Sequence, residues 1–153
     1  MSINDVFSKK VSKFAPTTRM CVTNTPLCPI ASFTMANVGQ INNEHTALYP
    51  CAGSCTLLLS CAKLAPKCKT VGVEIANNYY VNFNDTRKDF DAHDLHQPAG
   101  YVRGNFRKKS IRDEARNQII ECGSSSSNSN AEEEKEDVFH NSNKGFIELA
   151  VLA

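Results

Sequence analysis

Two residues, Gly53 and Glu74, carry the clearest chemical signal in this sequence. Gly53 lies in the stretch Cys51-Ala-Gly-Ser-Cys55 between two apolar runs, and Glu74 ends a run rich in β-branched residues 21 positions later. In doubly wound sheets, a glycine turn after the first strand lets the backbone approach a cofactor at a helix N-terminus. A carboxylate about 20 residues further on accepts hydrogen bonds from ribose hydroxyls. The pair therefore predicts a nucleoside-cofactor site, which needs a strand–helix–strand unit to position it.

The apolar pattern around the pair predicts such a unit. Strands are predicted at 46–49, 69–75 and 101–103, and helices near 31–41 and at 56–64, 76–95 and 110–122. Val138-Phe139 is predicted as a fourth strand, followed by a short last element at 146–152. Alternating strands and helices predict an α/β fold that is Rossmann-like, with a mostly parallel sheet and helices on both faces.

Length and composition favour one globular domain. The chain has 153 residues, of which 41% are hydrophobic and 22% charged. We expect an N-terminal arm at 1–40 and a domain at 41–153, interrupted by a low-complexity, solvated loop at 123–137. No apolar run approaches the roughly 20 residues that cross a bilayer, so no membrane partner is expected.

A local cluster of basic residues stands out against a net charge of only +1. Its members are Arg103, Arg107, Lys108, Lys109 and Arg112. The cluster is interpreted either as the exposed start of a helix or as a contact for a nucleosome, nucleic acid or acidic partner.

Seven cysteines suggest thiols that are reduced rather than paired, in the nucleus or cytosol. Four of them, Cys51, Cys55, Cys61 and Cys68, lack the closely paired spacing of common zinc sites, so buried inert thiols are the favoured interpretation. A second metal candidate comprises Asp91, His93, Asp94 and His96, but it falls where the polar end of a helix is expected. No metal is therefore predicted.

The motifs resemble those of a known enzyme family. The run from Cys51 to Glu74, CAGSCTLLLSCAKLAPKCKTVGVE, resembles motif I and the acidic strand of class I S-adenosylmethionine-dependent methyltransferases. It is most similar to the non-SET histone-lysine methyltransferases named for disruption of telomeric silencing. Further similar segments follow in the same order over about 51–146: Thr86-Arg-Lys-Asp-Phe90, Gly104-Asn105-Phe106 and Val138-Phe-His-Asn141.

The resemblance implies a role for each matching residue. The loop residues Cys51, Gly53, Cys55 and Thr56 would hold the methionine part of S-adenosylmethionine, and Glu74 its ribose. Asn105 would bind the adenine amine, with Phe106 beside the ring. Asn141 would lie near the transferred methyl group and the incoming lysine, as the catalytic position. The implied activity is methylation of a protein lysine, in a histone or nucleosome, and the implied location is the nucleus.

Several positions depart from the family pattern. Cys51 and Cys55 stand where the family prefers glycine, Tyr49 and Asn105 where it has aspartate, and Thr56 where it has glutamine. A complete enzyme of this kind continues for several strands, so the sheet is expected to be incomplete at its C-terminal end. The alternatives are an inactive methyltransferase-fold binding module or, third, a small zinc-stabilised interaction domain.

Overall fold

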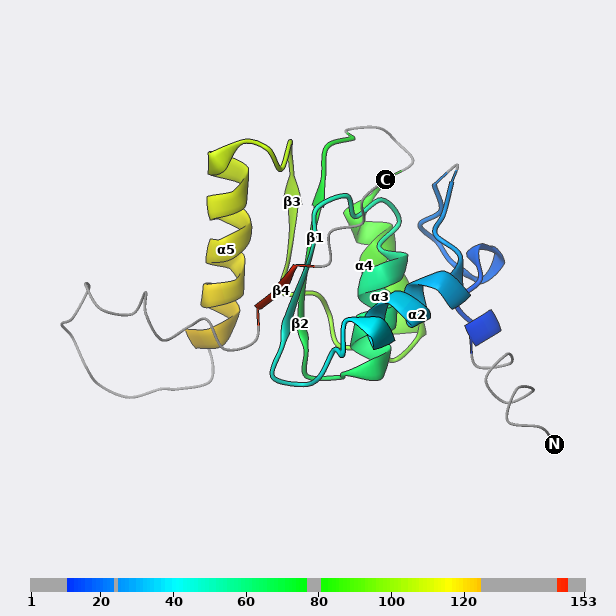
Figure 1. Cartoon of the computed structure of the whole chain (residues 1–153). Coiled ribbons are helices and arrows are strands. Elements are labelled where there is room, and N and C mark those ends of the chain that lie inside the picture. The colour runs from blue at the N-terminus through cyan, green and yellow to red at the C-terminus, as the bar shows by residue number, and fades with distance from the viewer. Residues whose placement is uncertain (1–10, 24, 77–80, 125–145, 149–153) are drawn as a thin grey trace.

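The fold is built on a parallel sheet of four strands, in the order β3-β2-β1-β4 (Figure 1). The computed structural model describes residues 11–23, 25–76, 81–124 and 146–148. The strands are β1 (Thr46–Tyr49), β2 (Lys69–Glu74), β3 (Gly100–Arg103) and β4 (Phe146–Glu148). Every pairing is parallel. This order is the first part of the classic doubly wound sheet and confirms the predicted α/β, Rossmann-like class.

Helices cover both faces of this sheet (Figure 1). They are α2 (Pro29–Val38), α3 (Thr56–Leu64), α4 (Phe83–Ala92) and α5 (Lys109–Ser124), preceded by the short 3₁₀ helix η1 (Pro16–Thr18). In Figure 1, α5 lies on one side of the sheet, and α2, α3 and α4 lie on the other. The connection from β3 through α5 to β4 therefore crosses to the other face and leaves β1 and β4 as neighbours at the switch point.

The sheet separates two hydrophobic clusters. Ala47 and Tyr49 of β1 face the larger cluster with α3, whereas Leu48 faces the smaller one with Ala115 of α5. Both faces of a parallel strand are buried in this way, which explains its continuous apolar run. The helix α3 is equally enclosed, because its first seven residues are all buried.

The N-terminal segment shares the larger cluster. Val11, Phe14 and Phe33 are buried in it, and α2 packs against α3. Between these two helices, the hydroxyl groups of Ser32 and Ser60 lie 2.7 Å apart and share a hydrogen bond. Residues 11–23 and 25–38 thus belong to the same packed unit as the sheet, although they fall within the predicted arm.

The predicted start of the third helix is wrong. The sequence pattern predicts a start at 76, whereas α4 begins at Phe83. The Asn82 side chain caps the helix by accepting a hydrogen bond from the Asn84 backbone N–H (2.9 Å). The predicted strand at 138–139 lies outside the described residues. The strand that pairs with β1 is Phe146–Glu148, within the predicted last element.

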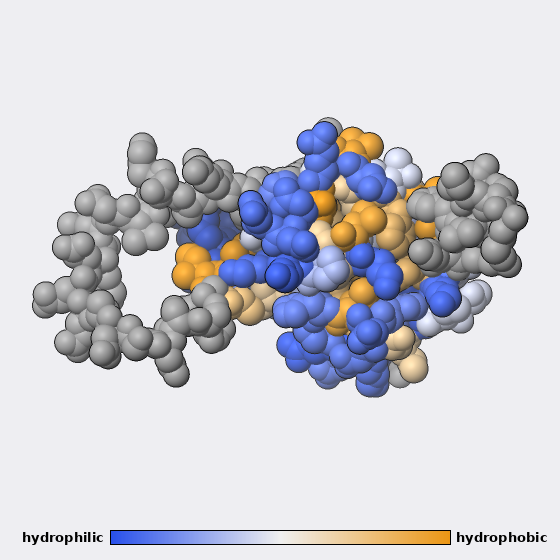
Figure 2. Space-filling view, turned by 90° about the horizontal axis from the view of Figure 1, so that it is seen from below, coloured by the Kyte–Doolittle hydropathy of each residue, from blue (hydrophilic) through white to orange (hydrophobic). Residues whose placement is uncertain are grey.

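The underside of the molecule is mainly hydrophilic. Figure 2 shows hydrophilic residues across most of this face, with hydrophobic residues in smaller patches between them. Across the parts of the chain that the structure describes, no helix combines the length and apolar character that a membrane span needs.

Gly72 of β2 packs closely against the loop that follows β1 and against α3, so a larger residue at this position should lower stability. A Cβ atom at Gly72 would lie 3.0 Å from the Cβ of Ala52 and 3.1 Å from the Cδ1 of Leu58. Gly72→Ala should lower the free energy of unfolding by about 1–3 kcal/mol, measured by urea denaturation.

Two further variants test the cause. Adding Ala52→Gly to the Gly72→Ala variant should recover part of the loss. Gly39→Ala, at an ordinary φ of −69°, should change stability by less than about 0.5 kcal/mol. A Gly72→Ala protein as stable as the wild type would contradict the packing argument.

Candidate functional site

The candidate site is the loop between β1 and α3, at the carboxyl end of the sheet. Gly53 has a φ of +49°, a left-handed conformation that favours glycine. The backbone N–H of Ala52 donates to the carbonyl of Val73 (2.8 Å), which fixes the loop against β2. The loop therefore occupies the edge where doubly wound folds bind their ligands.

Glu74 joins three loops at this edge. Its Oε2 accepts a hydrogen bond from the Gly53 backbone N–H and its Oε1 one from that of Ala76, both at 2.7 Å. Its backbone carbonyl accepts from the N–H of Gly104 after β3 (2.9 Å). Glu74 is buried, with only 8% of its surface exposed. The structure thus brings Gly53 and Glu74, the two residues singled out by their spacing, into direct contact.

A cavity of about 180 Å³ lies over this loop. The loop side of the cavity is formed by Tyr49, Cys51, Ala52, Gly53, Ser54 and Thr56, and the opposite side by Thr23, Thr25 and Leu27 of the N-terminal segment. A Cβ atom at Gly53 would lie 4.0 Å from the Cγ2 of Thr23, across this space. The volume is below the roughly 300–1,000 Å³ of pockets that enclose a whole drug-sized ligand. It suits one end of a cofactor.

Cys55 does not narrow the cavity. It is the N-cap of α3, has the left-handed conformation (φ 57°, ψ 25°) and is completely buried, and it is not among the residues that line the cavity. Burial raises the pKa of its thiol, so the group stays neutral. Cys51, by contrast, is exposed and lines the cavity. The backbone at Cys55 therefore has a conformation that glycine adopts more readily than a residue with a Cβ atom.

A buried ion pair between Arg19 and Asp89, which the sequence analysis did not predict, supports the loop between β1 and α3. Arg19 and Asp89 are both buried, with Nη2 and Oδ2 3.2 Å apart. The guanidinium also donates to the hydroxyl of Thr56 (2.6 Å) and to the carbonyl of Ser54. Asp89 accepts in addition from the backbone N–H groups of Met20 (2.6 Å) and Cys21 (3.1 Å). The network ties the N-terminal segment and α4 to the first residue of α3.

Three of the predicted cofactor residues, Glu74, Asn105 and Phe106, are not among the residues that line the cavity. The side-chain oxygen of Asn105 accepts from the backbone N–H of Arg107 (2.9 Å), and Phe106 packs beside Ile111 and Ile119 against the smaller cluster. Neither residue lines the cavity, although both follow β3 at the same edge of the sheet. Asn141, the predicted catalytic residue, lies outside the described residues.

Arg103 has a different role from the rest of the basic cluster. Its guanidinium donates to the carbonyls of Ala76 and Val81 and lies 4.4 Å from the centre of the Phe83 ring. Arg107, Lys108, Lys109 and Arg112 are exposed around the start of α5. The surface that is open to an acidic partner therefore consists of these four residues.

The metal candidates do not assemble in the described residues, where no group of three or more potential ligands comes together. Burial raises the pKa of Cys61 to about 12 and that of Cys68 to about 11, values that favour the thiol over the metal-binding thiolate. His93 packs instead on Phe14, with ring centres 4.4 Å apart.

Comparisons with known proteins add no relative. No family model and no curated protein matches this chain. The chemistry of the site must therefore be argued from its geometry.

The buried ion pair generates the first prediction at this site. Asp89→Asn should lower the free energy of unfolding by about 3–5 kcal/mol, because it leaves the Arg19 charge buried without a counter-charge. Chemical denaturation measures the loss. Asp94→Asn is the control and should change stability by less than about 0.5 kcal/mol, because Asp94 is exposed and asparagine tolerates its φ of +53°. Equal effects of the two substitutions would refute the role of the ion pair.

The conformation of Cys55 generates a second prediction. A left-handed backbone costs roughly 1–2 kcal/mol for a residue with a Cβ atom, so Cys55→Gly should be about 1 kcal/mol more stable than Cys55→Ala. The order should reverse at Cys61, which is equally buried but lies inside α3, where glycine costs about 1 kcal/mol relative to alanine. Thermal or urea unfolding of the four variants measures both differences. The same order at both positions would contradict the assigned strain.

Proposed function

We propose that this chain binds S-adenosylmethionine at the loop between β1 and α3 and transfers its methyl group to a lysine of a protein. The observation that carries the proposal is the contact between Gly53 and Glu74 at the carboxyl edge of adjacent parallel strands. A glycine turn and an acidic strand end in this arrangement are the usual elements of a nucleoside-cofactor site.

The methionine end of the cofactor is assigned to the cavity over Gly53. There the first turn of α3 begins without a side-chain cap, so its backbone N–H groups can face a carboxylate. Thr23 and Thr25 line the opposite wall and offer hydroxyl groups. These features match an amino-acid group better than an apolar ligand.

The ribose end is assigned to Glu74. Its two carboxylate oxygens each accept one backbone hydrogen bond, which leaves about two of four acceptor positions for ribose hydroxyls. The adenine is assigned to the loop after β3, which the Gly104 N–H holds next to Glu74. Asn105 and Phe106 follow Gly104 directly, in keeping with their predicted contacts to the adenine.

The reaction needs little acid–base chemistry from the protein. The cofactor supplies a methyl group that is already activated by its sulfonium. The chain must hold the lysine amine, made neutral by loss of its proton to solvent before the site closes, in line with that group and exclude water. The amine nitrogen would form the new bond to the methyl carbon, and the electron pair of the broken bond would go to the sulfur of the departing S-adenosylhomocysteine. Asn141 remains our proposed residue for positioning the amine. A histone or nucleosome substrate and a nuclear location rest on the resemblance of the motifs.

Calorimetry with S-adenosylhomocysteine tests the proposal directly. We expect saturable binding with one site per chain, and its loss in Glu74→Ala. Because Glu74 also holds the loop, Gly53→Ala provides a second test in which the carboxylate is kept: its added Cβ meets no atom closer than 4.0 Å but strains the left-handed backbone by roughly 1–2 kcal/mol, and it should weaken binding at least about tenfold in a protein that stays folded. Glu44→Ala, at an exposed glutamate, should bind as the wild type does.

A failure to bind S-adenosylhomocysteine would distinguish the proposed enzyme from the alternative, a non-catalytic binding module. A folded protein that gives no heat at millimolar ligand would refute the cofactor site and favour the non-catalytic binding module. That alternative is supported by the four exposed basic residues around the start of α5. It requires that affinity for an acidic partner fall steeply with salt. Transfer itself is measured with methyl-labelled cofactor and nucleosomes.

A further inference from the structure

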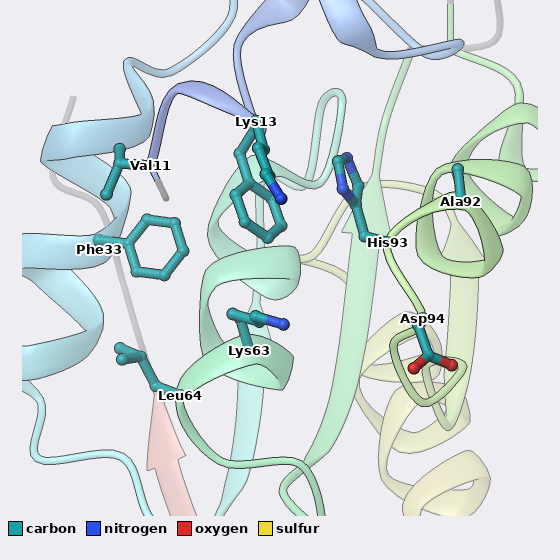
Figure 3. A pocket seen from close by; sticks show the side chains of 9 residues that line it. Val11, Lys13, Phe33, Lys63, Leu64, Ala92, His93 and Asp94 are labelled. Carbon is teal, nitrogen blue, oxygen red and sulfur yellow. The ribbon is translucent and has the colours of Figure 1, made fainter. Parts of the chain in front are cut away.

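A second and larger cavity lies away from the candidate site. It has a volume of about 610 Å³ and forms between the C-terminal ends of α3 and α4 and the N-terminal segment (Figure 3). The cavity over Gly53 borders the opposite end of α3, and no residue lines both cavities. The volume lies within the range of roughly 300–1,000 Å³ that encloses a complete small ligand.

Most of the wall of this larger cavity is apolar. Its apolar residues are Val11, Phe14, Phe33, Leu64 and Ala92. Phe14 and Phe33 meet edge to face, with ring centres 5.2 Å apart, and Phe14 stacks on His93. A flat or elongated apolar group could pack against this aromatic wall.

The charged groups at the cavity favour an anion. Lys13 and Lys63 line it together with one acid, Asp94. Figure 3 shows both lysine side chains extending toward the middle of the pocket. Neither amine has an ion pair or hydrogen bond with another residue of the described ranges. Two cations against one anion leave a positive site beside an apolar wall.

His93 adds a polar group without a partner. Its Nε2 is buried and makes no hydrogen bond among the described residues. Burial lowers the pKa of the imidazole, and the nearby cations Arg19, Lys63 and Lys13 lower it further, against the opposing effect of Asp89. The ring is therefore neutral at pH 7 and leaves the two lysines as the cations of the cavity wall.

We propose that this cavity binds a small amphipathic anion, a carboxylate or sulfonate with an aromatic or aliphatic body. The acid group lies between Lys13 and Lys63, and the body packs against Phe14 and Phe33. This binding activity is separate from cofactor binding at the loop after β1 and does not depend on it.

The probe for this site is 8-anilinonaphthalene-1-sulfonate, which combines an aromatic body with one negative charge. We expect a saturable fluorescence increase with one site per folded chain. Decanoate should displace the probe and decanol should not, because only the former carries the charge. Affinity should fall as salt is raised.

Lysine variants and a cavity-filling variant distinguish binding in this cavity from general binding at the surface. Lys13→Gln and Lys63→Gln should each weaken binding by up to about fivefold, and the double variant by about tenfold or more. Leu64→Trp should abolish it by filling the cavity, since Leu64 is 40% exposed and has room for a larger side chain. The matched control, Lys67→Gln with Lys109→Gln, changes two exposed lysines outside the cavity and should bind as the wild type does.

Several results would overturn the proposal. These are no binding by a folded wild-type protein at millimolar probe, equal affinity in the double lysine variant, or unchanged binding in a folded Leu64→Trp protein. Displacement by decanol as effective as that by decanoate would show that the charge plays no part. Near-ultraviolet circular dichroism of each variant confirms that it retains its packed core.

Discussion

The buried ion pair between Arg19 and Asp89 links the N-terminal segment to α4 and to the loop after β1. A buried charge without a partner costs several kcal/mol, so neither residue can keep its place unless the other is present. The guanidinium also bonds to Ser54 and Thr56, and the carboxylate holds the backbone at Met20 and Cys21. The N-terminal segment, the loop after β1 and α4 must therefore form together. Thr23, Thr25 and Leu27 follow this anchor directly, so the ion pair also sets the wall of the cavity over Gly53.

In the proposed cofactor site, Glu74 would serve both the stability of the loop and ribose binding at the same edge. Its carboxylate holds the backbone at Gly53 and Ala76, so part of its hydrogen-bonding capacity maintains the loop. A ribose must add to these bonds rather than replace them, because displacing them would leave two backbone N–H groups in a partly buried place without acceptors. A carboxylate with two oxygens can serve both purposes, whereas a neutral amide would offer only one acceptor atom. This requirement explains why an acid is suited to this position even before any ligand binds.

The local pattern of apolar and polar residues predicts the strand β1 and the helix α3 correctly. The bounds of α3 and β1 match the prediction, because an apolar run between a turn and a lysine-rich end leaves few alternatives. The start of α4 did not follow from periodicity, since Asn82 supplies a cap that outweighs the continuing pattern. The partnership of Arg19 with Asp89 joins residues 70 positions apart, and single residues of common types give no signal of such a contact. The cysteines after β1 looked alike in sequence, yet one is exposed and the other buried with left-handed backbone, a difference that only the path of the chain decides.

The two cavities border the same helix but have no lining residue in common. Each borders one end of α3, a helix of nine residues that spans about 13 Å, and each is closed by a different part of the N-terminal segment. Between those two parts lies Arg19, fixed to Asp89 and to the first turn of α3. Coupling between two sites requires an element with two alternative arrangements that both ligands bias. Moving the wall of one cavity relative to the other would separate Arg19 from Asp89, which costs several kcal/mol for a buried charge.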